Sequence, residues 1–169
     1  MILVKIVTLW SFLFTFRRFI ACRLVYFNVF SLVNMNPALA TLFESFEEKI
    51  NRQGFNEVGE GQCHIFLGKE RARDGYCYVS YSFNHVKSSC TVGKAQYSVN
   101  FRLSPYDFPQ GFHVSHLCHN KKCIKIQHLS LEPAGINLSR KACVSGGRCL
   151  GHGDYPLCLL NYRFVYINI

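Results

Sequence analysis

The residues most able to carry chemistry lie in the second half of the chain, where cysteines and histidines follow one another at short spacings. Four residues separate Cys118 from Cys123, and four more separate Cys123 from His128. A single loop can therefore bring two thiolates and an imidazole to a tetrahedral zinc ion, while the fourth ligand must come from elsewhere. The upstream candidates are Cys63, Cys77 and Cys90.

A second set of metal-ligand side chains follows and needs no residue from outside. It spans sixteen residues and comprises Cys143, Cys149, His152 and Cys158. Glycines within this stretch supply the turns with which a loop wraps around an ion. Local disulfides or unrelated buried thiols are the alternatives. They leave the histidine between the cysteines unexplained, so the pattern favours zinc.

The charge of the chain favours a polyanionic partner. The 169 residues include 19 Lys and Arg against 10 Asp and Glu, which gives a formal net charge of +9. The excess is concentrated from Lys94 onward, where nine basic residues accompany three acidic ones. Nucleic acid is the first class of partner that such a surface predicts, and an anionic membrane is the second.

The first 34 residues differ in composition from the rest and set the expected domain boundary. Residues 1–34 contain apolar stretches on both sides of Arg17 and Arg18, and no acidic residue. A signal peptide, a membrane helix and a translation start at Met35 compete as explanations, and the arginine pair weakens the membrane helix. We expect an apolar leader, untranslated or disordered, followed by a single domain over residues 35–169.

A packing helix is expected at the start of this domain, over residues 37–52. Asn36 suits the N-cap, Pro37 suits the first helical position, and Gly54 closes the helix. The apolar residues that fall on one helical face are Leu39, Leu42, Phe43, Phe46 and Ile50.

Short alternating runs after this helix predict an antiparallel sheet over about residues 61–105. The runs are Gln62–Leu67, Tyr76–Phe83 and Lys94–Leu103. In the last run one face is apolar, and the other could read base edges in a DNA major groove. Its polar residues are Lys94, Gln96, Ser98, Asn100 and Arg102. A strand that merely faces solvent is the alternative.

The sequence from Ser115 to Asn120, followed by Cys123, resembles the conserved motif of the His-Cys box homing endonucleases. These enzymes are encoded within group I introns of nuclear ribosomal DNA. The resemblance is specific over residues 113–158. It implies an α+β fold of the small, zinc-stabilised ββα-metal type, with antiparallel sheets, few helices and two structural zinc sites. A β-hairpin bearing a histidine would pack against a helix bearing an asparagine.

The same resemblance implies a role for each matching residue. His116 would be the general base, and Asn137 would hold the catalytic magnesium ion. The first zinc would be bound by Cys63, Cys118, Cys123 and His128, and the second by Cys143, Cys149, His152 and Cys158. The resemblance gives His119 neither role, and His113 is left without one. The basic residue that contacts the scissile phosphate is not aligned among Lys87, Lys94 and Arg102.

Each implied role suits the residue type. A neutral imidazole can take a proton from water if a backbone carbonyl orients its other nitrogen. An amide oxygen is a hard neutral ligand suited to magnesium, which would stabilise the departing oxygen as a Lewis acid. Both zinc sets offer four protein ligands and leave no open position, so zinc would be structural. Cys22 lies in the leader and is not expected to be a ligand.

The expected function is therefore that of a site-specific homing endonuclease that cuts both strands of DNA. A homodimer acting on a long pseudo-palindromic ribosomal DNA site, in the nucleus, would supply two sites related by symmetry. Residues 159–169 would form a C-terminal tail. The alternatives are a zinc-stabilised DNA-binding module, a decayed inactive endonuclease, and a secreted disulfide-rich protein whose first 22 or so residues are a signal peptide.

Overall fold

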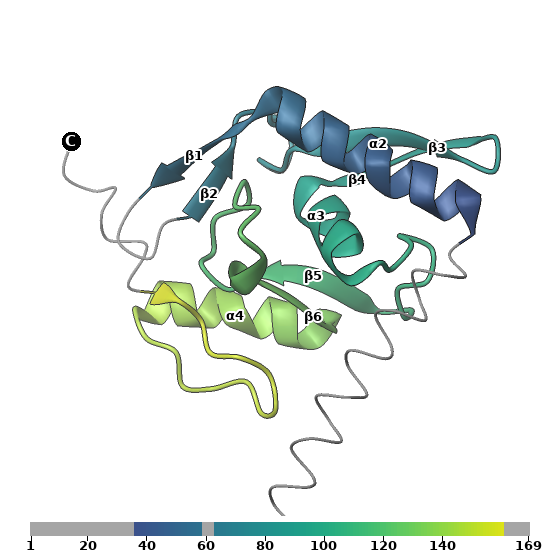
Figure 1. Cartoon of the computed structure of the whole chain (residues 1–169). Coiled ribbons are helices and arrows are strands. Elements are labelled where there is room, and N and C mark those ends of the chain that lie inside the picture. The colour runs from purple at the N-terminus through teal and green to yellow at the C-terminus, as the bar shows by residue number, and fades with distance from the viewer. Residues whose placement is uncertain (1–35, 59–62, 161–169) are drawn as a thin grey trace, which may run out of the picture. The chain divides into compact units, whose positions relative to one another are not determined.

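The computed structural model describes residues 36–58 and 63–160 (Figure 1). The expectations for the leader over 1–34, for Cys22 and for most of the tail over 159–169 lie outside these residues. The chain divides into two units, Met1–Pro37 and Ala38–Ile169, and the fold described below belongs to the second, with Pro37 as the first residue of its first helix. None of the helices in the described ranges is both long and apolar enough to cross a membrane.

The first described helix, α2 (Pro37–Gln53), confirms the helix expected over residues 37–52. Its buried residues are Leu42, Phe43, Phe46 and Ile50. The helix ends at Gly54, which has a φ of +75° and donates its backbone N–H to the Ile50 carbonyl. The buried face packs on strand β3, where the Phe46 and Tyr81 rings meet edge to face at 5.2 Å.

Two of the three expected strands are present, but they belong to separate two-stranded sheets. Strand β1 (Phe55–Val58) pairs antiparallel with β2 (Cys63–Phe66), and β3 (Tyr78–Phe83) pairs antiparallel with β4 (Val86–Thr91). Asn84 and His85 join β3 to β4 with φ of +49° and +63°, as in a type I′ hairpin turn.

The third expected strand, Lys94–Leu103, is wrong, because the segment is helix α3 (Val92–Phe101). Thr91 caps this helix, and its side chain accepts a hydrogen bond from the Lys94 backbone N–H. The buried positions Val92, Ala95 and Ser98 recur every three residues, which is a helical period that the alternation of aromatic and polar residues concealed.

The helix also removes the single polar face that was expected to read DNA. Residues two apart share one face only in a strand, and on a helix they point in different directions. The five residues concerned are Lys94, Gln96, Ser98, Asn100 and Arg102. Ser98 is fully buried, and Arg102 follows the helix as its left-handed C-cap. These side chains do not form one DNA-facing row.

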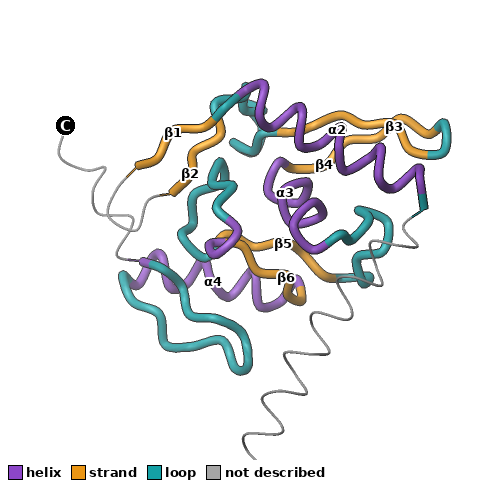
Figure 2. Tube along the Cα trace, in the orientation of Figure 1, coloured by secondary structure: helices purple, strands orange, loops and turns teal. Residues whose placement is uncertain are grey.

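The ββα arrangement implied by the resemblance is present in the second half of the chain. Strand β5 (Phe112–His116) pairs antiparallel with β6 (Leu129–Pro133), and helix α4 (Ala134–Gly146) follows directly and packs on both strands (Figure 1). A 3-10 turn, η1 (Ile126–His128), leads into β6. Figure 2 shows long loops before η1 and after α4, and these loops carry four of the eight cysteines in the described residues.

Candidate metal centres and active site

The first Cys/His cluster joins strand β2 to the loop between β5 and β6. It consists of Cys63, Cys118, Cys123 and His128, whose four ligand atoms lie within 4.8 Å of one another and are all buried. His128 Nδ1 lies 3.4 Å from the Cys63 sulfur and 3.6 Å from the Cys123 sulfur. A tetrahedral zinc site with ordinary bond lengths separates sulfur from nitrogen by about 3.6 Å. The cluster fits one zinc ion.

Backbone hydrogen bonds hold the distant ligand Cys63 against the loop. Ile124 donates its N–H to the His64 carbonyl, and Phe66 donates its N–H to the Lys122 carbonyl. Strand β2 therefore lies beside the loop, with the Cys63 sulfur facing Cys118 and Cys123. Of the three upstream candidates, the structure places Cys63 beside Cys118, Cys123 and His128.

Hydrogen bonds among the three thiols of the first cluster shift their pKa values in opposite directions. Hydrogen bonds from Cys118 and Cys63 lower the pKa of Cys123, whereas the hydrogen bond to Cys123 raises the pKa of Cys118. One thiolate is thus stabilised by two neighbouring thiols. A zinc ion would replace the shared protons, because zinc binds thiolates and releases protons on binding.

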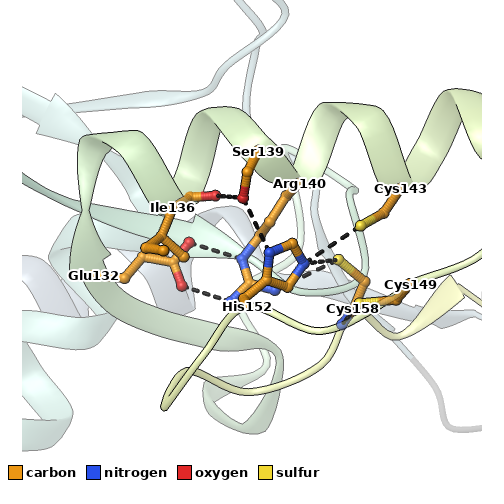
Figure 3. Close-up of polar contacts among 8 residues, drawn as sticks. All are labelled: Glu132, Ile136, Ser139, Arg140, Cys143, Cys149, His152 and Cys158. Atoms are coloured by element: carbon orange, nitrogen blue, oxygen red, sulfur yellow. Dashed lines mark hydrogen bonds and ion pairs between the residues drawn. The ribbon is translucent and has the colours of Figure 1, made fainter.

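The second cluster forms between α4 and the loop that follows it, as Figure 3 shows. Its members are Cys143, Cys149, His152 and Cys158, again with ligand atoms within 4.8 Å of one another. His152 Nε2 lies 3.4 Å from the Cys143 sulfur and 3.3 Å from the Cys158 sulfur. Gly151 and Gly153 flank the histidine with φ of +105° and +63°, which lets the loop turn back on the helix. This cluster fits a second zinc ion.

A hydrogen-bond chain from α4 orients His152 within this cluster. Its Nδ1 lies 3.0 Å from the Ser139 hydroxyl, which in turn donates to the Ile136 carbonyl at 2.7 Å (Figure 3). The hydroxyl proton is committed to the carbonyl, so the hydroxyl oxygen accepts from Nδ1–H of His152. This tautomer leaves the Nε2 lone pair directed at the sulfurs, as a zinc ligand requires.

A buried ion pair connects the second cluster to the ββα unit. Arg140 on α4 donates from Nε and Nη2 to the two Glu132 carboxylate oxygens at 2.7 and 2.6 Å. The third donor, Nη1, lies 3.4 Å from the Cys158 sulfur (Figure 3). The side chains of Arg140 and Glu132 are 2% and 0% exposed. Arg140 therefore joins β6, α4 and a zinc ligand through one guanidinium.

His116 lies at the end of β5, directly before the first cluster, and is buried. Its ring forms a hydrogen bond with the backbone of Cys123, and this bond raises the pKa of His116. A bond that raises the pKa of a histidine is one in which a ring N–H donates, so the acceptor is the Cys123 carbonyl. Nε2 is buried without a hydrogen-bond partner, so the donor is Nδ1. Burial outweighs the bond and lowers the pKa of His116 to about 4, which keeps the ring neutral.

Glycine at position 93 makes the close approach of α3 to His116 possible. A Cβ at Gly93 would lie 2.9 Å from His116 Nε2 and 3.1 Å from Cε1. No side chain can be placed there without moving the imidazole or the helix. The small space in front of Nε2 therefore depends on Gly93, a residue that sequence analysis did not single out.

Asn137 is the fourth residue of α4 and contacts His113, not His116. Its Nδ2 is 3.4 Å from His113 Nδ1, at the protein surface. The contacts of His116 are with Cys123, Gly93 and the ring of Tyr76, whose centroid is 6.0 Å away. The two residues expected to act together thus lie on the same ββα unit, in different immediate surroundings.

Sequence reasoning missed the residues that support the site. Glu132 and Arg140 were not singled out, because nothing in the sequence shows that these long charged side chains are buried. The unused cysteines have other roles in the described structure. Cys77 donates to the Gly68 carbonyl, and burial raises the pKa of Cys90 to about 12. Both behave as small core residues.

Comparison with known protein families gives one match. The family described as the zinc-binding loop region of homing endonuclease matches residues 56–155, a range that contains both strand pairs β3–β4 and β5–β6, helices α3 and α4, and all but one of the eight cluster residues. The remaining ligand, Cys158, lies three residues beyond it. A search of curated proteins found no match.

Metal analysis of the whole chain tests the two clusters. Purified protein should contain two zinc ions per chain, and Cys63→Ser should retain one, because a three-ligand site binds zinc much more weakly. Cys90→Ser is the matched control and should retain two, since Cys90 lies outside both clusters. If Cys63→Ser keeps two ions while Cys90→Ser loses one, the assignment of the upstream ligand is wrong.

Removal of Arg140 tests the buried ion pair. Arg140→Met should destabilise the zinc-loaded protein by about 3–5 kcal/mol, because it leaves the Glu132 carboxylate buried without a partner. Urea unfolding followed by circular dichroism measures the change. The double variant Arg140→Met with Glu132→Leu should recover much of the loss. Arg73→Met removes an exposed arginine and should change little. Equal losses in Arg140→Met and Arg73→Met would contradict the role given to the ion pair.

Proposed function

Because the chain belongs to the homing endonuclease family defined by this zinc-binding loop region, we propose that it is a site-specific endonuclease that hydrolyses phosphodiester bonds in double-stranded DNA. The observation that carries the proposal is the orientation of His116. Its Nδ1–H bonds the Cys123 carbonyl, and its Nε2 keeps a lone pair without a partner. A neutral imidazole held in this tautomer is the form that a general base requires.

In this proposal the protein's residues divide the reaction among them. His116 accepts the proton of the attacking water at Nε2 and, through the Cys123 carbonyl, remains correctly oriented as it becomes charged. Asn137 offers its amide oxygen from α4 to a divalent cation, a donor type that such ions accept. The bound cation, magnesium in the simplest case, would supply Lewis-acid stabilisation of the leaving oxygen. The two zinc ions would remain structural.

The polar face of the β3–β4 hairpin is the proposed DNA-reading surface, in place of the segment that forms α3. Ser80 pairs with Ser89, and Ser82 pairs with Lys87, and all four are exposed. The opposite face is covered, since Val79, Tyr81 and Cys90 are buried. Hydroxyls hydrogen-bond several base edges, and a two-stranded ribbon fits a major groove.

The wider setting of the reaction is proposed from the family. A homodimer would cut both strands of a pseudo-palindromic site, because one active site hydrolyses one strand. The target would be ribosomal DNA, reached in the nucleus, where a group I intron encoding the protein would spread.

The burial of Nε2 favours a second candidate, a zinc-stabilised DNA-binding module without cleavage. Water must reach this nitrogen for His116 to act, and in the structure the nitrogen lies against Gly93. A decayed endonuclease would have the same fold and would still bind DNA.

A cleavage assay separates the two candidates. The zinc-loaded chain is incubated with plasmid that carries intron-free ribosomal DNA, in magnesium or in EDTA. Site-specific, magnesium-dependent cutting is expected, and His116→Ala should slow it by about 100-fold to 10,000-fold because the general base is lost. Zinc content and DNA binding should be unchanged. If the wild-type chain binds this DNA without cutting it, or if His116→Ala cuts as fast, the endonuclease proposal fails.

The salt dependence of DNA affinity tests the β3–β4 surface. Lys87→Ala should weaken binding and reduce the slope of log affinity against log salt by about one, because one phosphate contact is lost. Lys141→Ala, which removes an exposed charge from α4, is the control and should leave the slope unchanged. Fluorescence anisotropy over a salt series measures both. Equal changes in the two variants would indicate diffuse attraction and not contact by the hairpin.

A further inference from the structure

An imidazole lies beside the amide that the proposed reaction assigns to the divalent ion. His113 is exposed on β5, and its Nδ1 is 3.4 Å from the Asn137 side-chain nitrogen. The two residues come from different elements and are 24 positions apart in the chain. Their side chains meet at the surface, where an ion that also binds DNA phosphate must be reachable.

His113 and the proposed base, His116, both belong to strand β5. His113 pairs with Glu132, whose side chain bonds Arg140 of α4, so this face of the hairpin lies toward α4. Successive residues of a strand point to opposite faces, and His116 is three positions further along. Its imidazole accordingly lies against Gly93 of α3. The strand therefore presents two imidazoles to two different surroundings.

We infer that His113 is a second protein ligand of the divalent ion held by Asn137. The inference rests on the proposed function, which gives Asn137 its role. Adjacent ligands of an octahedral ion with bonds of about 2.1 Å lie about 3 Å apart, close to the distance observed. A half-turn of the Asn137 amide places Oδ1 where Nδ2 lies, and the two orientations have the same shape. The pair then offers one nitrogen and one oxygen donor.

The donor set predicts which ion the site prefers. Carboxylate, carbonyl and water oxygens suit magnesium and manganese, whereas an imidazole nitrogen suits iron, nickel, copper and zinc. Glu132, which pairs with His113 across the hairpin, is fully buried and accepts from Nε and Nη2 of Arg140, so it does not add an exposed carboxylate to the set. The site of this chain is thus expected to bind Ni²⁺ more tightly than Mg²⁺, and Mn²⁺ can serve as its paramagnetic probe.

Pulsed electron paramagnetic resonance with Mn²⁺ tests the inference directly. Mn²⁺ is added to the full chain with both zinc sites filled, and coupling of the ion to an imidazole nitrogen is recorded. The wild-type chain should show this coupling, and His113→Gln should lose it while an amide oxygen still holds the ion. Mn²⁺ affinity should fall by at least about tenfold in His113→Ala. His85→Ala, an exposed histidine on the β3–β4 turn, should retain both properties.

The Mn²⁺ measurements distinguish the proposed ligand from the proposed activity. Absence of Mn²⁺ binding or of imidazole coupling in the wild type overturns the inference, as does coupling that survives in His113→Gln, since that would come from another histidine. The readout requires no cleavage, so it separates the inference from the proposed function. If the chain shows the coupling but cuts no DNA, the metal-site inference holds and the endonuclease proposal fails. If the chain cuts DNA without the coupling, the endonuclease proposal holds with Asn137 as the protein ligand, and the inference about His113 fails.

Discussion

The gathering of cysteines and histidines into two four-residue clusters is the constraint on which the rest of this structure depends. The described sheets have two strands each, and isolated pairs of this length are barely stable in water. The first cluster joins Cys63 to a loop that begins more than fifty residues later, and so ties β2 to the ββα unit. A metal-ligand bond here replaces the apolar core that such short elements cannot build.

The second cluster extends this constraint to helix α4. Arg140 bonds Glu132 on β6 and approaches Cys158, so the position of the helix on the hairpin and the position of the last ligand depend on the same side chain. Directly after Cys158, Leu159 donates its backbone N–H to the Leu117 carbonyl and packs on the first cluster. The two metal centres are therefore parts of one framework.

Much of this framework could be predicted because it depends on local spacing. Cys118, Cys123 and His128 lie close together in the sequence, and the second set lies within sixteen residues. Both sets can therefore be predicted as zinc ligands without knowledge of the fold. The segment after Thr91 could not be read in this way, because aromatic and polar residues alternate there while Val92 and Ala95 set the true helical period. The pairing of Glu132 with Arg140 was equally inaccessible, since burial of a charge depends on packing that only the folded chain defines.

The carbonyl that orients His116 belongs to Cys123, a residue of the first cluster. A single residue therefore contributes its sulfur to the zinc framework and its backbone oxygen to the proposed base. If zinc leaves, the loop that positions this oxygen loses its anchor, and the imidazole loses its orientation while the β3–β4 hairpin stays intact. A chain of this kind would have to bind zinc before His116 could act as a base, so zinc supply would control when the proposed chemistry begins.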